Sequence, residues 1–150
     1  MRIRKYINSD KKDVLELFKL NTPEFFSPSE ESDLNFYLDN HSEYYYVLEI
    51  ENRICACAGY NIFTDNLVRI SWDIVHPKKQ SKGLGTELTK FRLQKIREIE
   101  GVKLVSVRTT QLVYKFYEKF GFELKETLKD FWAAGFDLYR MECDVKLLKM

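Results

Sequence analysis

The sequence lacks a strong net charge, and it also lacks any long apolar run. Its 24 Lys and Arg residues are balanced by 23 Asp and Glu residues, which leaves a net charge of +1. A nucleic-acid-binding domain normally carries a strongly basic surface, so this balance argues against a nucleic-acid partner. No stretch approaches the ~20 consecutive apolar residues that span a bilayer, and we therefore expect no membrane partner.

Cysteine is scarce, and the three thiols form no metal-ligand pattern. Cys55 and Cys57 lie two residues apart in a predicted strand, and Cys143 is distant from both. The two histidines are also far apart in the chain, so the sequence predicts no metal site. Small buried thiols are typical of a reducing compartment. Residues 1–6 also lack the apolar core of a signal peptide, and we expect a cytoplasmic protein.

Linkers, internal repeats and low-complexity segments are absent as well. The 150 residues are 45% hydrophobic and 31% charged, which is typical of a folded globular chain. This length suits one hydrophobic core. We therefore expect a single domain over residues 1–150.

Hydrophobic periodicity predicts the element order βααβββαβαββ. The β–α–β passage in the middle of the chain predicts a right-handed parallel crossover. The turn before its helix would then lie at the carboxyl end of a central strand, where open α/β sheets bind ligands. The predicted strands cover residues 3–7, 44–50, 53–63, 67–75, 102–107, 122–128 and 136–145, and the predicted helices lie near residues 10–20, 29–38, 84–100 and 112–120.

The turn after the 67–75 strand has the features of an anion site. It runs Gln80-Ser81-Lys82-Gly83-Leu84-Gly85-Thr86 and opens a predicted helix. Glycine allows close backbone approach, and the first helical turn offers unpaired N–H groups and a partial positive charge. Three lysines at positions 78, 79 and 82 add full charges. We interpret the turn as a pyrophosphate cradle; an ordinary glycine-capped strand–helix junction is the alternative.

Two other phosphate motifs do not fit this turn. The Walker pattern GxxxxGK[ST] is absent, and the third glycine of a Rossmann GxGxxG would fall at Leu88. The spacing Gln-x-x-Gly-x-Gly over residues 80–85 instead resembles the acyl-CoA-binding motif of the GNAT superfamily of N-acetyltransferases. The run Phe-Tyr-Glu-Lys-Phe-Gly-Phe over residues 116–122 looks like a second GNAT motif, and the predicted element order matches over residues 3–145. Gln80 stands where the family commonly has arginine, and Thr110 where it often has asparagine.

The resemblance implies an α/β fold of mixed α+β type, with a splayed, mostly antiparallel seven-stranded sheet flanked by about four helices. It implies that strands 67–75 and 102–107 part and that acetyl-CoA, the co-substrate, lies in the opening. The pantetheine arm would pair with the 67–75 strand, and the pyrophosphate would bind the amides of the cradle. The expected cofactor-binding residues are Ile74, Val75, Gln80, Ser81, Lys82, Gly83, Leu84, Gly85, Thr86, Thr110, Tyr114 and Tyr117.

Catalytic roles follow from the same resemblance. Tyr117 occupies the position of the motif tyrosine whose hydroxyl faces the cofactor sulfur, and it is the candidate acid for the departing thiolate. A packed aromatic on an amphipathic helix is the alternative for this residue. The backbone N–H of Val75 is the expected oxyanion donor.

Asp73 is the candidate base for the amine proton. Strand alternation places Arg69, Ser71, Asp73 and Val75 on one face and Ile70, Trp72 and Ile74 on the other. A carboxylate close to the parted strands could take the proton through a water. Asp73 could instead orient the substrate or form an ion pair with Arg69.

The predicted function is transfer of an acetyl group from acetyl-CoA to a primary amine, by direct transfer in a ternary complex. A non-catalytic acyl-CoA-binding or sensing domain and an interaction protein without a cofactor are the alternatives. The acceptor would be a small-molecule or peptide amine, bound by residues 24–37 and by a loop at 130–136, and a homodimer is left open. Acids and aromatics in these segments would suit a cationic amine, but helix-end charges and core aromatics are the favoured explanation for them.

Overall fold

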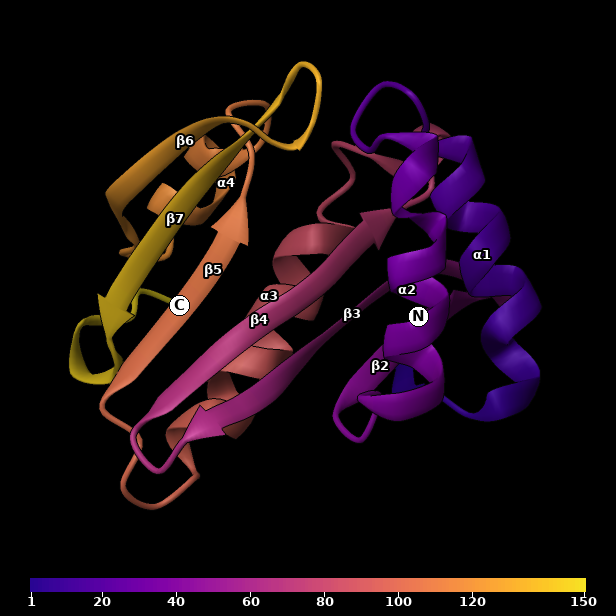
Figure 1. The fold of residues 1–150 in the computed structure, drawn as a ribbon. Helices are drawn as coiled ribbons and strands as arrows, with labels where there is room; N and C mark the ends of the chain where they lie inside the picture. Colours follow the sequence, from indigo (N-terminus) through magenta and orange to yellow (C-terminus); the bar gives the residue numbers. More distant parts are fainter.

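Seven strands form one mixed sheet in the order β1-β2-β3-β4-β5-β7-β6, as the computed structural model of residues 1–150 shows (Figure 1). Every neighbouring pair is antiparallel except β4 and β5. The predicted element order and fold class are confirmed, although the helices at 84–100 and 112–120 are shorter than predicted. The elements are β1 (Arg2–Lys5), α1 (Lys11–Leu20), α2 (Glu31–Asn40), β2 (Tyr45–Ile50), β3 (Arg53–Thr64), β4 (Leu67–Val75), α3 (Leu84–Arg97), β5 (Leu104–Thr109), α4 (Tyr114–Glu118), β6 (Glu123–Ala133) and β7 (Phe136–Asp144).

Helices cover both faces of the sheet, and each face has its own apolar cluster. In Figure 1, α1 and α2 lie in front of the sheet and α3 lies behind it. The apolar stripes of α1 and α2, including Val14 and Leu34, pack in a cluster of 10 buried residues. The stripe of α3, including Leu88, packs with α4 in a cluster of 21. None of these helices has the length and apolar character needed to cross a membrane.

The central pair β4 and β5 separates along its length, as expected for the splayed sheet. Their parallel pairing runs from Leu67 opposite Leu104 to Ile70 opposite Val107, and no pair follows it. The carboxyl-terminal ends of the two strands diverge in Figure 1. Because unpaired strand edges keep free N–H and C=O groups, this opening offers polar backbone atoms to a ligand.

A bulge in β4 overturns the predicted alternation of that strand. Trp72 has a φ of +48°, and the β3–β4 register shifts opposite it. Ile70 belongs to the cluster under α3, whereas Trp72 and Ile74 pack on the α1 and α2 side. The extra residue at a bulge reverses the faces of everything that follows. Asp73 therefore lies on the α3 face, opposite to Arg69, and the prediction that they share a face is wrong.

The predicted loop at 130–136 is also different from the structure. β6 continues to Ala133, and only a short turn separates it from β7. Asp130 has a φ of +53° and lies in a register shift. Its carboxylate accepts a hydrogen bond from the Gly135 N–H at 2.8 Å, and its own N–H donates to Asp137 at 2.9 Å. The segment is thus a closed hairpin end.

Candidate active site

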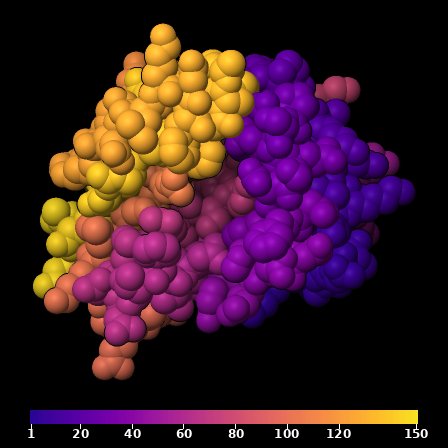
Figure 2. Space-filling model, viewed as in Figure 1, coloured from indigo at the N-terminus to yellow at the C-terminus, as the bar shows by residue number.

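A cleft of about 1140 Å³ opens where β4 and β5 part. Figure 2 shows a hollow between the C-terminal hairpin, the β3–β4 hairpin and the N-terminal helices. Its walls come from β4, the turn at 80–86, β5, α4 and the segment before α2. The cleft is large enough for an extended ligand and brings both sequence motifs together, as the predicted crossover requires.

The turn before α3 has the geometry of an anion-binding cradle. Gly83 has a φ of +83°, and a side chain built on it would meet nothing within 4 Å. The N–H groups of Leu84, Gly85 and Thr86 lie in the first helical turn and donate to no loop or cap carbonyl. Three unpaired amides at a positive helix end, beside open space, fit a phosphate or pyrophosphate.

Gln80 and Asn21 anchor this turn. The Gln80 side-chain amide donates to the Val75 carbonyl at 3.2 Å and to the Asn21 side chain at 3.1 Å. Asn21, the residue after α1, donates to the same carbonyl at 3.1 Å. Asn21 is only 3% exposed, and no local sequence pattern indicates this burial. The Val75 carbonyl is therefore occupied and is not one of the free groups expected along β4.

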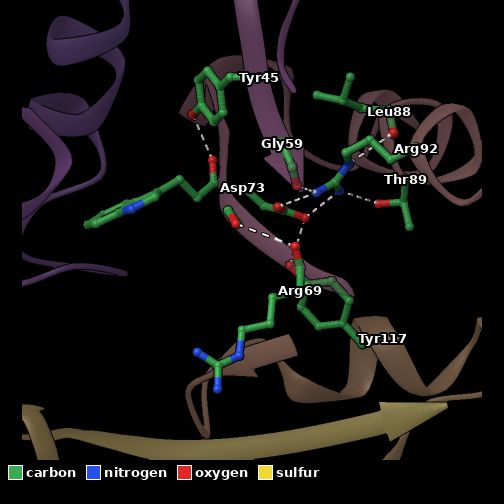
Figure 3. A network of polar contacts seen from close by, with 10 residues as sticks. Tyr45, Gly59, Arg69, Asp73, Leu88, Thr89, Arg92 and Tyr117 are labelled. Atoms are coloured by element: carbon green, nitrogen blue, oxygen red, sulfur yellow. Dashed lines mark hydrogen bonds and ion pairs between the residues drawn. The ribbon is translucent and has the colours of Figure 1, made fainter. Parts of the chain in front are cut away.

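A buried ion pair joins β4 to α3 (Figure 3). The Arg92 guanidinium donates to both carboxylate oxygens of Asp73, at 2.7 and 2.6 Å. Its remaining N–H groups donate to the carbonyls of Leu88 and Gly59 and to the Thr89 hydroxyl. Arg92 is 0% exposed, and every side of the guanidinium is hydrogen-bonded.

Arg92 was missed by the sequence reasoning, yet the sequence holds a signal for it. It follows Leu88 by four residues and precedes Ile96 by four, so it lies on the apolar stripe of the helix. Charged residues on such a stripe are almost always paired. Arg69, by contrast, points away from Asp73 in Figure 3, so the expected Arg69–Asp73 alternative does not occur.

Tyr117 contacts the same carboxylate from α4. Its hydroxyl donates to Asp73 Oδ2 at 2.8 Å, and the residue is 5% exposed. Burial raises the pKa of Tyr117 well above its usual value; the negative charge of Asp73 adds to this rise, and Arg92 opposes it. The phenol therefore keeps its proton at neutral pH. Tyr117 can release that proton only to a strong acceptor placed in the cleft.

The structure places most of the other predicted binding residues in the cleft wall and two of them outside it. Ile74, Val75, Gln80, Ser81, Gly83 to Thr86 and Thr110 line the cleft. Lys82 and Tyr114 do not, and Lys79 lines it in place of Lys82. The Tyr114 ring instead packs on Tyr139, with centroids 4.8 Å apart.

Another part of the cleft wall is aromatic and charged. Phe26 stacks on Trp72 with centroids 5.9 Å apart. Among the acids of the 24–37 segment, Glu30 lines the cleft. Its carboxylate accepts a hydrogen bond from the Ser27 N–H at 2.9 Å. Burial raises the pKa of Glu30. Two arginines, Arg69 and Arg108, also line the cleft.

Comparisons with known proteins agree with this geometry. Residues 12–122 match the family model described as the acetyltransferase (GNAT) family. The fold is similar to an aminoglycoside 6'-N-acetyltransferase complexed with coenzyme A, with a TM-score of 0.76 and 14% identity, covering 97% of each chain.

Two further solved structures share the fold. The loading GNATL domain of CurA from Lyngbya majuscula has a TM-score of 0.82 and 15% identity, covering 97% of this chain and 98% of that one. The ribosomal-protein-S18-alanine N-acetyltransferase from Escherichia coli has a TM-score of 0.79 and 16% identity, covering 96% and 93%.

Proposed function

The chain belongs to the acetyltransferase (GNAT) family of acyltransferases, and from that premise we propose that it forms one domain that acetylates a primary amine. The transfer is direct, in a ternary complex with acetyl-CoA, and uses no covalent enzyme intermediate. One observation carries the proposal: the unpaired cradle amides and the protonated Tyr117 line the same cleft.

Acetyl-CoA fits the groups that the chain presents. Its pyrophosphate matches the amides of Leu84, Gly85 and Thr86, and Lys79 lies beside them in the cleft wall. The parted edge of β4 around Ile74 and Val75 faces the pantetheine arm. Bound acetyl-CoA supplies the acetyl group as a thioester, and the other product is free CoA thiol.

Tyr117 is the proposed proton donor. Because its pKa is raised well above the usual value, the proton stays on Oη until a strong proton acceptor, such as the departing thiolate, forms beside it. The Val75 N–H is the proposed oxyanion donor, since it lies at the parted end of β4.

Asp73 has two candidate roles. Three donors from Arg92 and Tyr117 already occupy its carboxylate. Both carboxylate oxygens already accept hydrogen bonds, so these contacts favour orientation of Tyr117 over removal of the amine proton. The base role remains the second proposal.

The acceptor is proposed to be a small-molecule or peptide amine. Two of the similar structures support both kinds of acceptor for this fold. One is an aminoglycoside N-acetyltransferase, and the other is a ribosomal-protein-alanine N-acetyltransferase. A cytoplasmic location remains a proposal and agrees with three free, buried cysteines. A non-catalytic acyl-CoA sensor is the alternative function.

Tyr117→Phe tests the enzyme against the sensor. We expect wild type to release CoA thiol from acetyl-CoA with at least one member of an amine panel. In Tyr117→Phe, kcat should fall by ~10²–10⁴-fold, the usual contribution of general acid–base catalysis, while acetyl-CoA affinity stays unchanged. Tyr114→Phe is the matched control, because it lies on the same helix outside the cleft. Acetyl-CoA binding without turnover on any amine would favour the sensor.

A further inference from the structure

Two arginines face the cleft without an acidic partner. Arg69 on β4 and Arg108 on β5 both line the cleft, and neither forms an ion pair within 4.0 Å. The Nε atom of Arg69 is buried and has no hydrogen-bond partner. Arg140, opposite Arg108 on β7, is instead paired with Glu126 and Glu142.

Strand register brings Arg69 and Arg108 to the base of the opening. Arg69 lies opposite Ser106, and Ile70 opposite Val107 is the last β4–β5 pair. Arg108 is thus the first β5 residue beyond the pairing. Since Val68 and Ile70 belong to the cluster under α3, the side chain of Arg69 between them projects from the other face. That is the face on which Figure 2 shows the cleft open.

Aromatic rings hold both guanidinium groups in place. Arg69 lies over the Phe63 ring at 3.8 Å. Arg108 lies over Phe131 at 5.2 Å and over Trp132 at 5.4 Å. Stacking occupies a face of a guanidinium and leaves its N–H edges free to bind an oxyanion in a bidentate manner.

The cleft acids do not neutralise these charges. Asp73 is bound by Arg92, the Glu30 carboxylate accepts from the Ser27 N–H, and Glu43 makes no ion pair. Burial lowers the pKa of Arg69, and the positive charges of Arg108 and Arg140 lower it further. A buried donor without a partner and two like charges in one cleft are both destabilising, so their presence indicates an anionic ligand.

We infer that the amine acceptor carries an oxyanion, a carboxylate or a phosphate, which Arg69 and Arg108 bind. This inference rests on the proposed function and adds the acceptor class. The oxyanion anchors the acceptor at the base of the opening, so that its amine faces the cleft wall that holds Asp73 and Tyr117. In the reaction the amine N–C bond replaces the thioester S–C bond, and the thiol takes the proton that the nitrogen loses.

The test compares matched acceptors that differ only in charge. Amino acids are assayed beside their carboxamides, and aminoalkyl phosphates beside the corresponding amino alcohols. Wild type should prefer the charged member by ~10-fold or more in kcat/KM, as expected for hydrogen bonds to a charged group. Arg69→Gln and Arg108→Gln should reduce this preference to below ~2-fold. Arg140→Gln, on the same face but already paired, should keep it. The charged series with the higher kcat/KM shows whether the preferred oxyanion is a carboxylate or a phosphate.

A binding readout keeps the inference independent of turnover. With CoA at saturation, inorganic phosphate should raise the Tm of wild type above that in chloride of equal ionic strength, and should not do so in Arg69→Gln/Arg108→Gln. The Tm of Arg69→Gln itself should stay equal or rise, because a repulsive charge is removed.

Two results would overturn the inference while the proposed function stands. One is equal use of charged and uncharged acceptors by a protein that binds acetyl-CoA. The other is a large fall in Tm for Arg69→Gln with no change in acceptor preference, which would make Arg69 a structural residue. Failure of wild type to bind acetyl-CoA would instead remove the proposed function.

Discussion

Glu30 combines a structural contact with an electrostatic penalty. It is 8% exposed, and its side chain accepts from the Ser27 N–H ahead of α2. Burial raises its pKa because the charged form loses hydration, and the nearby Asp33 adds to this rise. A carboxyl whose folded pKa is raised destabilises the fold above that pKa. The penalty disappears as the pH falls below the unfolded value of about 4.3.

Glu30→Gln should therefore raise Tm at pH 7 to 8, since the glutamine oxygen keeps the hydrogen bond from Ser27. The Tm difference should shrink as the pH falls and vanish below about pH 4. Thermal unfolding followed by circular dichroism across this range measures it. Glu31→Gln, at the same helix start but more exposed, controls for the helix-end charge. A Tm difference that is independent of pH would contradict the account.

Single residues of the site were predictable to different degrees. Gly83 and Tyr117 could be found because each lies in a motif with local spacing, and both line the cleft. Arg92 and Asn21 act through partners on other elements, Arg92 on Asp73 and Asn21 on Val75. No local pattern encodes such distant contacts. Arg69 and Arg108 could not be predicted as a pair for the same reason, because neither strand alone shows that both residues line one cleft.

At the scale of elements, β4 shows where periodicity stops being informative. Alternation describes the strand correctly up to Ser71, and the bulge at Trp72 then reverses it. A positive φ at tryptophan is unusual, and a hydrophobic pattern does not predict it. The reversal directs Asp73 towards Arg92 and Tyr117. Asp73 therefore lines the cleft as predicted, but its partners are Arg92 and Tyr117 and not Arg69.

The Asp73–Arg92 pair links β4 to α3 and should behave as a unit. Asp73→Ala leaves a fully buried guanidinium without its carboxylate, and we expect a loss of about 3–5 kcal/mol in unfolding free energy. Arg92→Met alone should also destabilise the fold, since it leaves Asp73 without its guanidinium. The double variant should lose clearly less than the sum of the two single losses. Urea unfolding of all four proteins measures the coupling, and additive losses would show that the pair is not coupled.

At the scale of the whole molecule, the parting of β4 and β5 makes one cleft with two chemically different ends. The α3 end presents unpaired amides, and the other end presents Arg69 and Arg108. The element order and the central crossover could be read from the sequence because helices and strands differ in hydrophobic period. How far the strands part depends on packing across the sheet, and only the family resemblance indicated it.

The central claim is that the turn before α3 binds the pyrophosphate of acetyl-CoA. Gly83 allows a sharp test, because asparagine and aspartate both tolerate its left-handed backbone and have the same shape. They differ by one negative charge placed in the open space of the cradle. Calorimetric titration of acetyl-CoA into wild type, Gly83→Asn and Gly83→Asp compares the three.

We predict that wild type binds acetyl-CoA and that Gly83→Asp binds it at least ~10-fold more weakly than Gly83→Asn, a difference of about 1.4 kcal/mol. Equal affinities for the two variants would show that no anion lies beside Gly83, and absence of binding to wild type would contradict the account as a whole.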